Sequence, residues 1–448
     1  MFSSVRKEFK RTFRLSVPIT IGLVGQGLFG VIDTVMISNI LGEHALAAAT
    51  LGNNVNWVPL LLIIGITVAI PVLTAQARGA GTEREIPGIL RHGILISLLV
   101  AVIGTIALCA FILADGLLWL DQPESVSAAA KNFSCIIALS IPAAAGFQAI
   151  KSFRDARGGQ WISLFWTLIG LISNIFLNWV FMKGALGFPN WGLEGAAAGT
   201  LFSRLISLAG IIFHEKLVCE FRKGFSLDGI RKNLRISLPS TLHIVFDAGL
   251  FIVAPFFMGW INEASIAANQ VVHTISALVY MLPLGISQAL SIRIGEAYGR
   301  GNMPRIRVIF AGATAFILSA MGIIAIVLIV FRNDVPVLFN LGEEASLLAS
   351  SFLLVACAYL LFDGFQTVAS GALRGIGDVK IIAVAAFICY WIIGCPTALL
   401  LAFPLGMNGV GVWIGLASGL GSMALILGWR VFRDLAKNPR GSDVPALP

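Results

Sequence analysis

Three aspartates lie inside long hydrophobic runs of the sequence, where a carboxylate is unfavourable. They are Asp33, Asp247 and Asp363. A charged Asp at the centre of a membrane helix costs about 2.5–3.5 kcal/mol on insertion scales, so such groups usually face a cavity, pair with a partner or carry a proton. We therefore predict that these three carboxylates bind a proton or another small cation. The alternative for each is a protonated side chain that only hydrogen-bonds a neighbouring helix.

Two of these acids have a polar residue one helical turn earlier. His243 precedes Asp247 by four residues and Tyr359 precedes Asp363 by four, so each pair shares a helix face. Both pairs belong to the second half of the sequence. We expect Asp247, Asp363 and Tyr359 to line one cavity, with His243 in support.

The first half carries its own polar residues inside hydrophobic runs. Gln26 precedes Asp33 by seven residues, on the same helical face, and Asn174 and Asn178 lie four residues apart in the fifth run. Such groups commonly hydrogen-bond between helices. Arg204, in the stretch LFSRLIS, is a cation inside the sixth run. It could pair with an acid or extend toward the cytoplasmic surface, and the sequence leaves both open.

The elements that position these residues are set by composition. Of 448 residues, 57% are hydrophobic and 12% are charged, whereas a soluble domain spends about a quarter of its residues on charge. A soluble protein of this composition would expose large apolar patches, which soluble monomers rarely do. Six cysteines occur without a CxxC pair, so we predict neither disulfides nor a metal site.

Twelve hydrophobic runs approach the roughly 20 residues that a membrane-spanning helix needs. They lie near 14–37, 46–75, 92–114, 127–150, 161–182, 193–214, 236–260, 264–292, 308–330, 346–370, 381–402 and 408–430. The runs do not alternate apolar and polar residues as the strands of membrane barrels do. We therefore predict an all-α polytopic membrane protein with twelve transmembrane helices.

Lys and Arg are concentrated in alternate connections between these runs. The cation-poor connections hold only Lys131, Lys183 and Arg332. The cation-rich ones include both ends of the chain, the 215–235 connection and the connection containing Arg374 and Lys380. The positive-inside rule then predicts that both termini and the 215–235 connection are cytoplasmic, in a multi-pass protein of the plasma or bacterial inner membrane. The net charge of +8 follows this topology, so we expect no nucleic-acid partner.

The two halves of the sequence resemble each other. RLSVPIT (14–20) pairs with RISLPST (235–241), and GITVA (65–69) pairs with GISQA (285–289). Several matches in the same order favour a duplication, with each half supplying six helices. We predict two pseudo-symmetric six-helix bundles that rock against each other. Their predicted bounds are an N-terminal lobe at 1–214, a connecting loop at 215–235, a C-terminal lobe at 236–435 and a cytoplasmic tail at 436–448.

Three stretches resemble the MATE (multidrug and toxic compound extrusion) family, in its NorM-like bacterial branch. They are VIDTVM (31–36), MLPLGIS…SIRIGEAYG (281–299) and DGFQTVASGALRGIGD (363–378). The resemblance extends over essentially the whole chain. It implies a secondary active antiporter that exports organic, often cationic and aromatic compounds by alternating access, driven by inward H⁺ or Na⁺. It implies no cofactor, and we expect the protein to act as a monomer in the lipid bilayer.

The resemblance also implies roles for single residues. Asp33 is similar to the N-lobe carboxylate that takes up a proton or a cation, and Asn174 and Asn178 match polar positions of the N-lobe cavity. The cation site of the C-terminal lobe corresponds to Asp247, Asp363 and Tyr359. One position departs from the branch, which usually carries Glu where this chain has the shorter Asp247.

Other functions are less consistent with the sequence. A flippase for lipid-linked saccharides, of related architecture, would need a cationic cleft for pyrophosphate, and Arg204 is the one cation deep inside a predicted span. A proton-translocating subunit of a larger complex would carry mid-span Lys and Glu. An enzyme is not expected, because the sequence contains no phosphate loop, zinc pattern or GxSxG motif.

Overall fold

A computed structural model of the chain describes residues 2–120, 123–215, 224–339 and 341–436, which form helices and no strands. Residues 216–223 of the predicted connecting loop lie outside the described residues, as does the predicted cytoplasmic tail from residue 437 onward. The prediction of an all-α membrane protein is confirmed, since twelve helical segments are long and apolar enough to cross a membrane.

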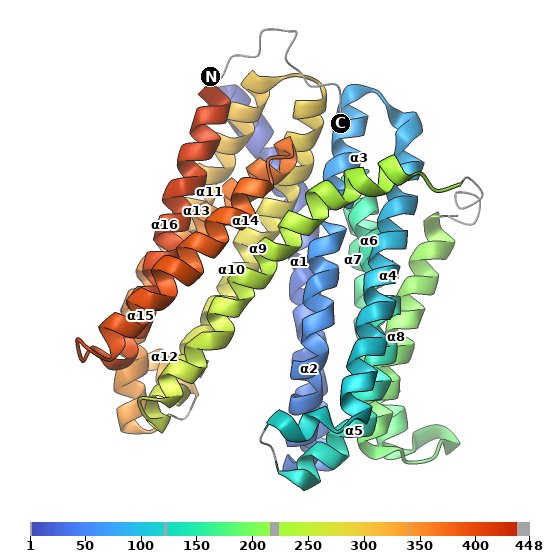
Figure 1. Cartoon of the computed structure of the whole chain (residues 1–448), viewed down its shortest axis with the longest axis vertical. Coiled ribbons are helices and arrows are strands. Elements are labelled where there is room, and N and C mark those ends of the chain that lie inside the picture. The colour runs from blue at the N-terminus through green and yellow to red at the C-terminus, as the bar shows by residue number, and fades with distance from the viewer. Residues whose placement is uncertain (1, 121–122, 216–223, 340, 437–448) are drawn as a thin grey trace. The chain divides into compact units, whose positions relative to one another are not determined.

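Figure 1 shows the helices in their order along the chain. In the first half they are α1 (Phe2–Leu41), α2 (Glu43–Thr67), α3 (Ala69–Ala80), α4 (Ile86–Leu113), α5 (Glu124–Leu139), α6 (Ile141–Ala156), α7 (Gln160–Lys183) and α8 (Gly192–Glu215). In the second half they are α9 (Leu227–Gly259), α10 (Glu263–Gly299), α11 (Met303–Val330), α12 (Asp334–Leu338), α13 (Glu343–Ile376), α14 (Lys380–Ala386), α15 (Cys395–Ala402) and α16 (Asn408–Ala436). Short 3₁₀ turns lie at Glu83–Glu85, Gly116–Leu120 and Ala185–Gly187.

Local sequence explains where several helices begin and end. The side chain of Asn262 accepts a hydrogen bond from the backbone of Ser265 and so caps the start of α10, and Asn302 caps α11 through Arg305. Gly377 ends α13 with a left-handed backbone (φ 87°), which glycine adopts without steric cost. Capping residues and glycines therefore mark the same helix ends that the hydrophobic runs predict only approximately.

Several spans are interrupted helices. The second span breaks between α2 and α3, shortly before Pro71, and the fourth breaks at Ser140, before Pro142. The eleventh span consists of α14, the π-helix η5 (Phe387–Gly394) and α15, whose first turn contains Pro396. Proline lacks a backbone donor, and neighbouring helices and local adjustments satisfy the freed carbonyls in such membrane helices.

The prediction that Arg374 lies in a connection between spans is wrong. Helix α13 continues to Ile376, and the Arg374 side chain is only 8% exposed. SGALRG (370–375) contains two glycines, which disfavour a helix. The helix persists because tertiary partners satisfy Arg374, which lies 3.0 Å from His243 Nδ1. Arg374 is therefore a buried cation of the tenth span.

The chain divides into two compact units. The first, here called the C-unit, comprises the described parts of Met1–Thr20, Ala75–Thr82 and Leu242–Pro448. The second, the N-unit, comprises Ile21–Thr74 and the described parts of Glu83–Thr241. The predicted lobe boundaries at 214 and 235 stay a prediction. The two compact units differ from the predicted lobes because the first residues of α1 and the end of the second span belong to the C-unit.

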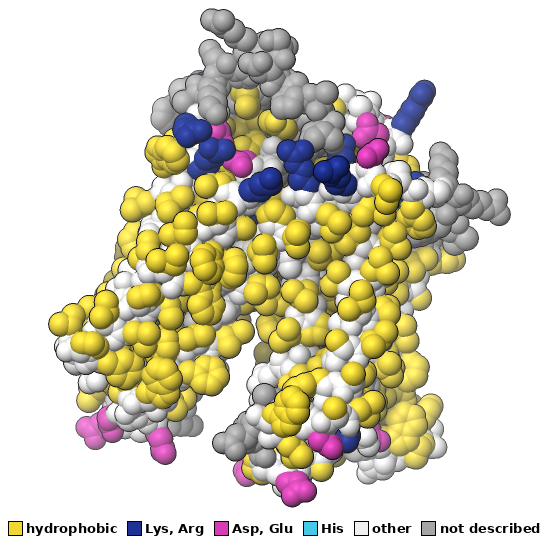
Figure 2. All heavy atoms as spheres, viewed as in Figure 1, with side chains coloured by type: hydrophobic (Ala, Val, Ile, Leu, Met, Phe, Trp, Pro, Cys, Tyr) yellow, Lys and Arg dark blue, Asp and Glu magenta, His cyan; other side chains and the backbone are white. Residues whose placement is uncertain are grey.

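Each unit has a surface suited to lipid. On the face in Figure 2, hydrophobic side chains cover most of each unit, and Lys and Arg gather toward one end of that face. Large apolar side chains in the middle of helices are largely exposed, including Ile103 (65% exposed), Ile106 (63%) and Leu425 (76%). Soluble monomers rarely expose so much apolar surface. The exposed apolar side chains therefore agree with a lipid bilayer around these helices.

Inside the C-unit, α10 and α13 approach each other closely at glycines. A Cβ atom added to Gly371 would lie 2.6 Å from the carbonyl oxygen of Ser287, and one on Gly375 would lie 2.9 Å from that of Ser291. The Ser287 hydroxyl donates to the Thr367 carbonyl at 2.6 Å. Small residues allow such backbone approach in membrane helices, and this contact fixes the helix that carries Asp363.

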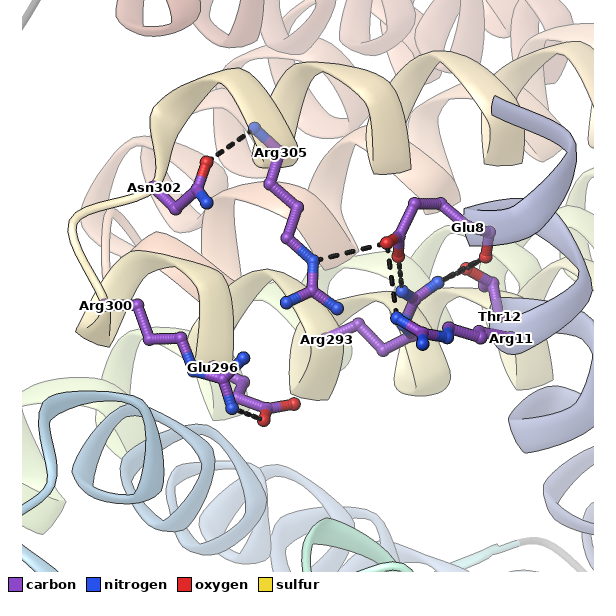
Figure 3. Close-up of polar contacts among 8 residues, drawn as sticks. All are labelled: Glu8, Arg11, Thr12, Arg293, Glu296, Arg300, Asn302 and Arg305. Carbon is purple, nitrogen blue, oxygen red and sulfur yellow. Dashed lines mark hydrogen bonds and ion pairs between the residues drawn. The ribbon is translucent and has the colours of Figure 1, made fainter. Parts of the chain in front are cut away.

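A charged cluster joins three helices of the C-unit (Figure 3). Glu8 on α1 forms ion pairs with Arg293 on α10 and with Arg305 on α11, the latter at 3.4 Å. The Arg293 guanidinium also donates to the Thr12 hydroxyl and to the Glu8 carbonyl. These contacts attach the beginning of α1 to α10 and α11.

Candidate cation-binding sites

Asp33 lies at the centre of a polar cluster inside the N-unit. Its Oδ1 accepts a hydrogen bond from Asn178 Nδ2 at 2.6 Å, and its Oδ2 accepts one from the Thr200 hydroxyl at 3.2 Å. Asn174 Nδ2 donates to the same Thr200 oxygen at 3.2 Å. All four side chains are buried. Helices α1, α7 and α8 therefore meet through the carboxylate of α1.

The local sequence makes this approach possible. Asn174 and Asn178 lie one turn apart on the buried face of α7. Gly199, beside Thr200, lets α8 pass very close to α7, because a Cβ atom there would lie 2.9 Å from the backbone nitrogen of Asn178. A larger residue at this position would separate Thr200 from Asp33.

Two acceptors in this cluster have no partner among the described residues. They are the amide oxygens of Asn174 and Asn178. A buried acceptor without a partner is unfavourable, and these oxygens could receive the proton of a protonated Asp33 or help to ligate a cation. The cluster therefore has groups suited to both charge states of the carboxylate.

Arg204 belongs to the same region of the N-unit. It lies one helical turn after Thr200 on α8, and its Nη1 donates to the Ser140 hydroxyl at 2.7 Å. Ser140 is the residue at the break between α5 and α6. The guanidinium is also close enough to Asp33 for a coulombic interaction.

Gln26 makes a hydrogen bond between helices, as the sequence analysis expects. Its Nε2 donates to Gln148 Oε1 at 3.3 Å, which links α1 to α6. No hydrogen bond between Gln26 and Asp33 occurs among the described residues. Its predicted supporting role near Asp33 therefore stays a prediction.

A second cluster of acids lies inside the C-unit. Asp363 on α13 accepts a hydrogen bond from Gln366 Nε2 at 3.1 Å and repels Asp247 on α9 electrostatically. Asp247 is partly buried and in turn attracts the guanidinium of Arg374. The two predicted C-lobe acids are therefore together, with a buried cation beside them.

His243 is bonded to that cation. Arg374 Nη2 lies 3.0 Å from His243 Nδ1. Arginine has no acceptor, so the imidazole nitrogen must accept this bond and the ring is uncharged in this arrangement. The cluster then consists of two carboxylates and one guanidinium, with one net negative charge when all three are ionised.

Three of the four tyrosines of the chain, Tyr280, Tyr359 and Tyr390, lie near both acids. The Tyr359 ring packs edge-on against Trp413 and Phe251, with centroids 5.9 and 6.2 Å apart. The Tyr390 hydroxyl and Asp247 Oδ1 are buried without a hydrogen bond of normal geometry. This aromatic lining makes the surroundings of Asp247 and Asp363 largely apolar.

Sequence reasoning missed several members of both clusters. They are Thr200, Gln366, Arg374, Tyr280 and Tyr390. A signal existed for the tyrosines, since the chain has only four of them. Thr200 carried no signal, because threonine is common in helices that pack against one another.

Comparison with known proteins agrees with this architecture. The family model MatE matches residues 18–180 and again 239–400. One model thus matches both halves, as a duplication requires.

Similar proteins from several bacteria cover nearly the whole chain. The probable multidrug resistance protein NorM of Mesorhizobium japonicum is 32% identical over 442 residues, which span 94% of this chain and 93% of that protein. The multidrug resistance protein NorM of Vibrio cholerae is 30% identical over 446 residues, which span 95% and 96%.

Solved structures share the fold. The eukaryotic MATE transporter AtDTX14 superposes with a TM-score of 0.86 at 23% identity, over 97% of both chains. A mutant of the Vibrio cholerae MATE transporter VcmN superposes with a TM-score of 0.89 at 18% identity, over 98% of this chain and 99% of that one. The chain therefore belongs to the MatE family and is a NorM-like membrane transporter, not an enzyme.

Proposed function

We propose that this protein is a multidrug efflux antiporter that exports organic, often cationic and aromatic compounds in exchange for inward H⁺ or Na⁺. One observation carries the proposal. Each compact unit holds its own carboxylate cluster, Asp33 in the N-unit and Asp247 with Asp363 in the C-unit. Intramembrane acids of this kind usually serve ion or proton pathways.

Charge competition at these carboxylates would couple the two movements. An ionised carboxylate attracts a cationic drug, and a carboxylate neutralised by H⁺ or Na⁺ does not. Occupancy by the ion and by the drug is then mutually unfavourable, which is a negative coupling between two binding events. The partners of Asp33 fit such an exchange, because Asn178 and Thr200 donate to the ionised form while unpartnered amide oxygens remain for the neutral one.

The available driving force is sufficient. One charge moving through 100 mV gains about 2.3 kcal/mol, and each pH unit adds about 1.36 kcal/mol. Keeping a neutral compound a hundredfold more concentrated outside than inside needs about 2.7 kcal/mol. For a neutral compound, a single coupling ion per drug therefore supports export without any cofactor.

The substrate class follows from the relatives and from the C-unit cluster. The relatives are called multidrug resistance proteins. Tyr359 lies near the two C-unit acids and packs against Trp413 and Phe251, and aromatic rings near carboxylates suit flat organic cations. We further propose a plasma or inner membrane location with both termini cytoplasmic, as the distribution of Lys and Arg predicts.

The flippase alternative is not strengthened by the additional buried cation. Arg374 is bonded to His243 and faces Asp247, and Arg204 is bonded to Ser140 near Asp33. Each guanidinium already has an acid nearby, so neither is free to bind a pyrophosphate. These two guanidiniums therefore do not form the cationic cleft that the pyrophosphate of a lipid-linked saccharide needs.

The experiment is transport of ethidium by the purified protein in proteoliposomes, with a Na⁺ gradient and a pH gradient imposed separately. The proposal expects ethidium movement under at least one inward gradient and none without a gradient. Ethidium transport at the same rate with and without either gradient would contradict antiport. Transport of a lipid-linked saccharide without ethidium transport would favour the flippase.

A further inference from the structure

Cys109 and Cys135 are two thiols of the N-unit that the proposed transport does not use. Both are free and half-buried. Cys109 lies on α4 and Cys135 on α5, two consecutive helices that belong to the third and fourth spans and therefore run antiparallel. Because the two residues are far apart in the sequence, no CxxC motif marks them.

A hydrogen bond fixes how the two helices are aligned. The Thr105 hydroxyl of α4 donates to the Ala138 carbonyl of α5 at 3.1 Å. Cys109 lies one turn after Thr105 on the same face of α4, and Cys135 lies one turn before Ala138 on the same face of α5. On antiparallel helices these two steps lead in the same direction. The two thiols therefore lie at the same level and face each other.

The packing around the thiols agrees with this alignment. Both cysteines pack against one cluster of buried apolar residues, which includes Ala101, Ala130 and Ala138. Such small residues let helix backbones approach closely. A disulfide needs Cα atoms no more than about 7 Å apart, and a threonine hydroxyl bonds the backbone of another helix only at a similar approach. The Cys135 thiol also forms a side-chain hydrogen bond with Cys109.

The position of the pair along the helices favours oxidation. Cys109 lies one turn before α4 ends at Leu113, about 6 Å along the helix axis. In the topology proposed above, this end of α4 faces away from the cytoplasm. Disulfides form and persist in the oxidising environments outside the cytoplasm. Cys357 differs from the pair, because it is buried and its thiol donates to the Ala325 carbonyl.

We propose that Cys109 and Cys135 are a redox-active pair that closes to a disulfide on the non-cytoplasmic side and so links α4 to α5 covalently. The inference rests on the proposed function for its membrane topology. The oxidant is a disulfide-carrying small molecule or protein. One cysteine thiolate attacks a sulfur of that disulfide and releases a first thiol. The other cysteine thiolate then attacks the protein sulfur of the mixed disulfide and releases a second thiol. The two cysteines lose two protons and two electrons, and the two released thiols carry them.

The test uses the purified full-length protein, with glutathione disulfide as the oxidant in mildly alkaline buffer, where thiolates form. Remaining thiols are blocked with N-ethylmaleimide in denaturant, and the protein is then digested with trypsin and examined by mass spectrometry. Cleavage after Lys131 separates the peptides that carry the two cysteines, 92–131 and 132–151. Only a disulfide keeps these peptides joined. We expect the joined peptides after oxidation and their separation by dithiothreitol.

Serine variants identify the partners. Cys109→Ser and Cys135→Ser should each abolish the link, whereas the matched variant Cys357→Ser should keep it. The oxidised wild-type protein should also unfold several degrees above the reduced protein, because a cross-link restricts the unfolded chain. Dithiothreitol should not change the unfolding midpoint of the Cys109→Ser and Cys135→Ser variants. No link after oxidation, or a link from either residue to a different cysteine, overturns the inference.

A reporter cysteine tests the topology separately. Trp119, in the turn after α4, is 79% exposed, and Trp119→Cys is added to the Cys109→Ser, Cys135→Ser variant. A membrane-impermeant maleimide should label this reporter from outside intact spheroplasts, and wild-type protein trapped by acid from the same cells should carry the link. Acid-trapped protein without the link, although the reporter is labelled, overturns the inference. A reporter that only a permeant maleimide labels contradicts the topology of the proposed function instead.

Discussion

The amide of Asn178 donates a hydrogen bond to the carboxylate of Asp33 at 2.6 Å, across a separation of 145 residues in the sequence. The bond is charge-assisted, which makes it stronger than a bond between neutral groups. It stabilises an ionised Asp33 in a buried place and leaves the Asn178 oxygen without a partner. Protonation of Asp33 would therefore change the contacts of α1 with α7.

Thr200→Val tests the second bond to this carboxylate. Valine has a similar shape but cannot donate to Asp33 Oδ2, and a hydrogen bond to a charged group contributes about 1.5–3 kcal/mol. We expect gradient-driven ethidium transport in proteoliposomes to fall about tenfold or more. Thr34→Val is the matched control, because the Thr34 hydroxyl is exposed and bonds only the Gly30 carbonyl of its own helix. Equal loss in both variants would contradict a role for the Thr200 bond.

Arg374→Gln is predicted to destabilise the C-unit through unbalanced charge. Removing one partner from a buried ionic group costs about 3–5 kcal/mol, since Asp247 and Asp363 would repel each other without compensation. We expect a lower midpoint of thermal unfolding in detergent and partial recovery when Asp247→Asn is added. Arg300→Gln, which breaks an exposed pair with Glu296, should change the midpoint little. Independent, additive effects of the Arg374 and Asp247 substitutions would argue against charge balance.

Glu8→Gln is predicted to loosen the beginning of α1 from its neighbours. The neutral side chain loses ion pairs with Arg293 and Arg305 (Figure 3), and Arg293 is only 8% exposed, so its charge stays uncompensated. We expect faster hydrogen–deuterium exchange in the first turns of α1 and a lower unfolding midpoint. Arg11→Gln removes only the 3.5 Å pair of a largely exposed arginine and should have little effect. Unchanged exchange in the Glu8 variant would refute this role.

Gly371→Ala is predicted to separate α10 from α13. The new methyl group would lie 2.5 Å from the Ser287 hydroxyl oxygen and 2.6 Å from its carbonyl oxygen, and overpacking of this kind costs about 1–3 kcal/mol. The unfolding midpoint should fall, together with ethidium transport, because α13 carries Asp363. Gly322→Ala is the control, since nothing lies within 4 Å of its added methyl group and alanine favours the helix. A Gly371 variant as stable as the Gly322 variant would contradict the close contact.

The number of spans could be predicted from the sequence, whereas the composition of the clusters could not. Hydrophobic length alone determines how many helices cross a bilayer, and the twelve runs correspond to the twelve helical spans. The spacing of Asn174 and Asn178 indicated a common face of α7, but only the fold shows that this face meets Asp33. Long-range contacts depend on which helices pack together, and the spacing of residues within one helix does not show that.

Arg374 illustrates a second limit of predicting structure from sequence. A hydropathy scan ends the tenth run at the first small and polar residues, so it placed this arginine outside the span. The helix continues because its neighbours satisfy the arginine, with His243 accepting a hydrogen bond at 3.0 Å and Asp247 supplying charge. A buried charge that is compensated by tertiary partners looks, in the sequence alone, like the residue that begins a loop.

The most direct test of the account is whether binding of a drug expels a bound cation. Purified protein in weakly buffered detergent solution is mixed with tetraphenylphosphonium, while a pH indicator and a sodium-sensitive electrode record released ions. The account predicts that the wild-type protein releases H⁺ or Na⁺ on drug binding and that the Asp33→Asn, Asp247→Asn, Asp363→Asn triple variant releases neither. Drug binding by the wild-type protein without any ion release, or equal release by the triple variant, would contradict it.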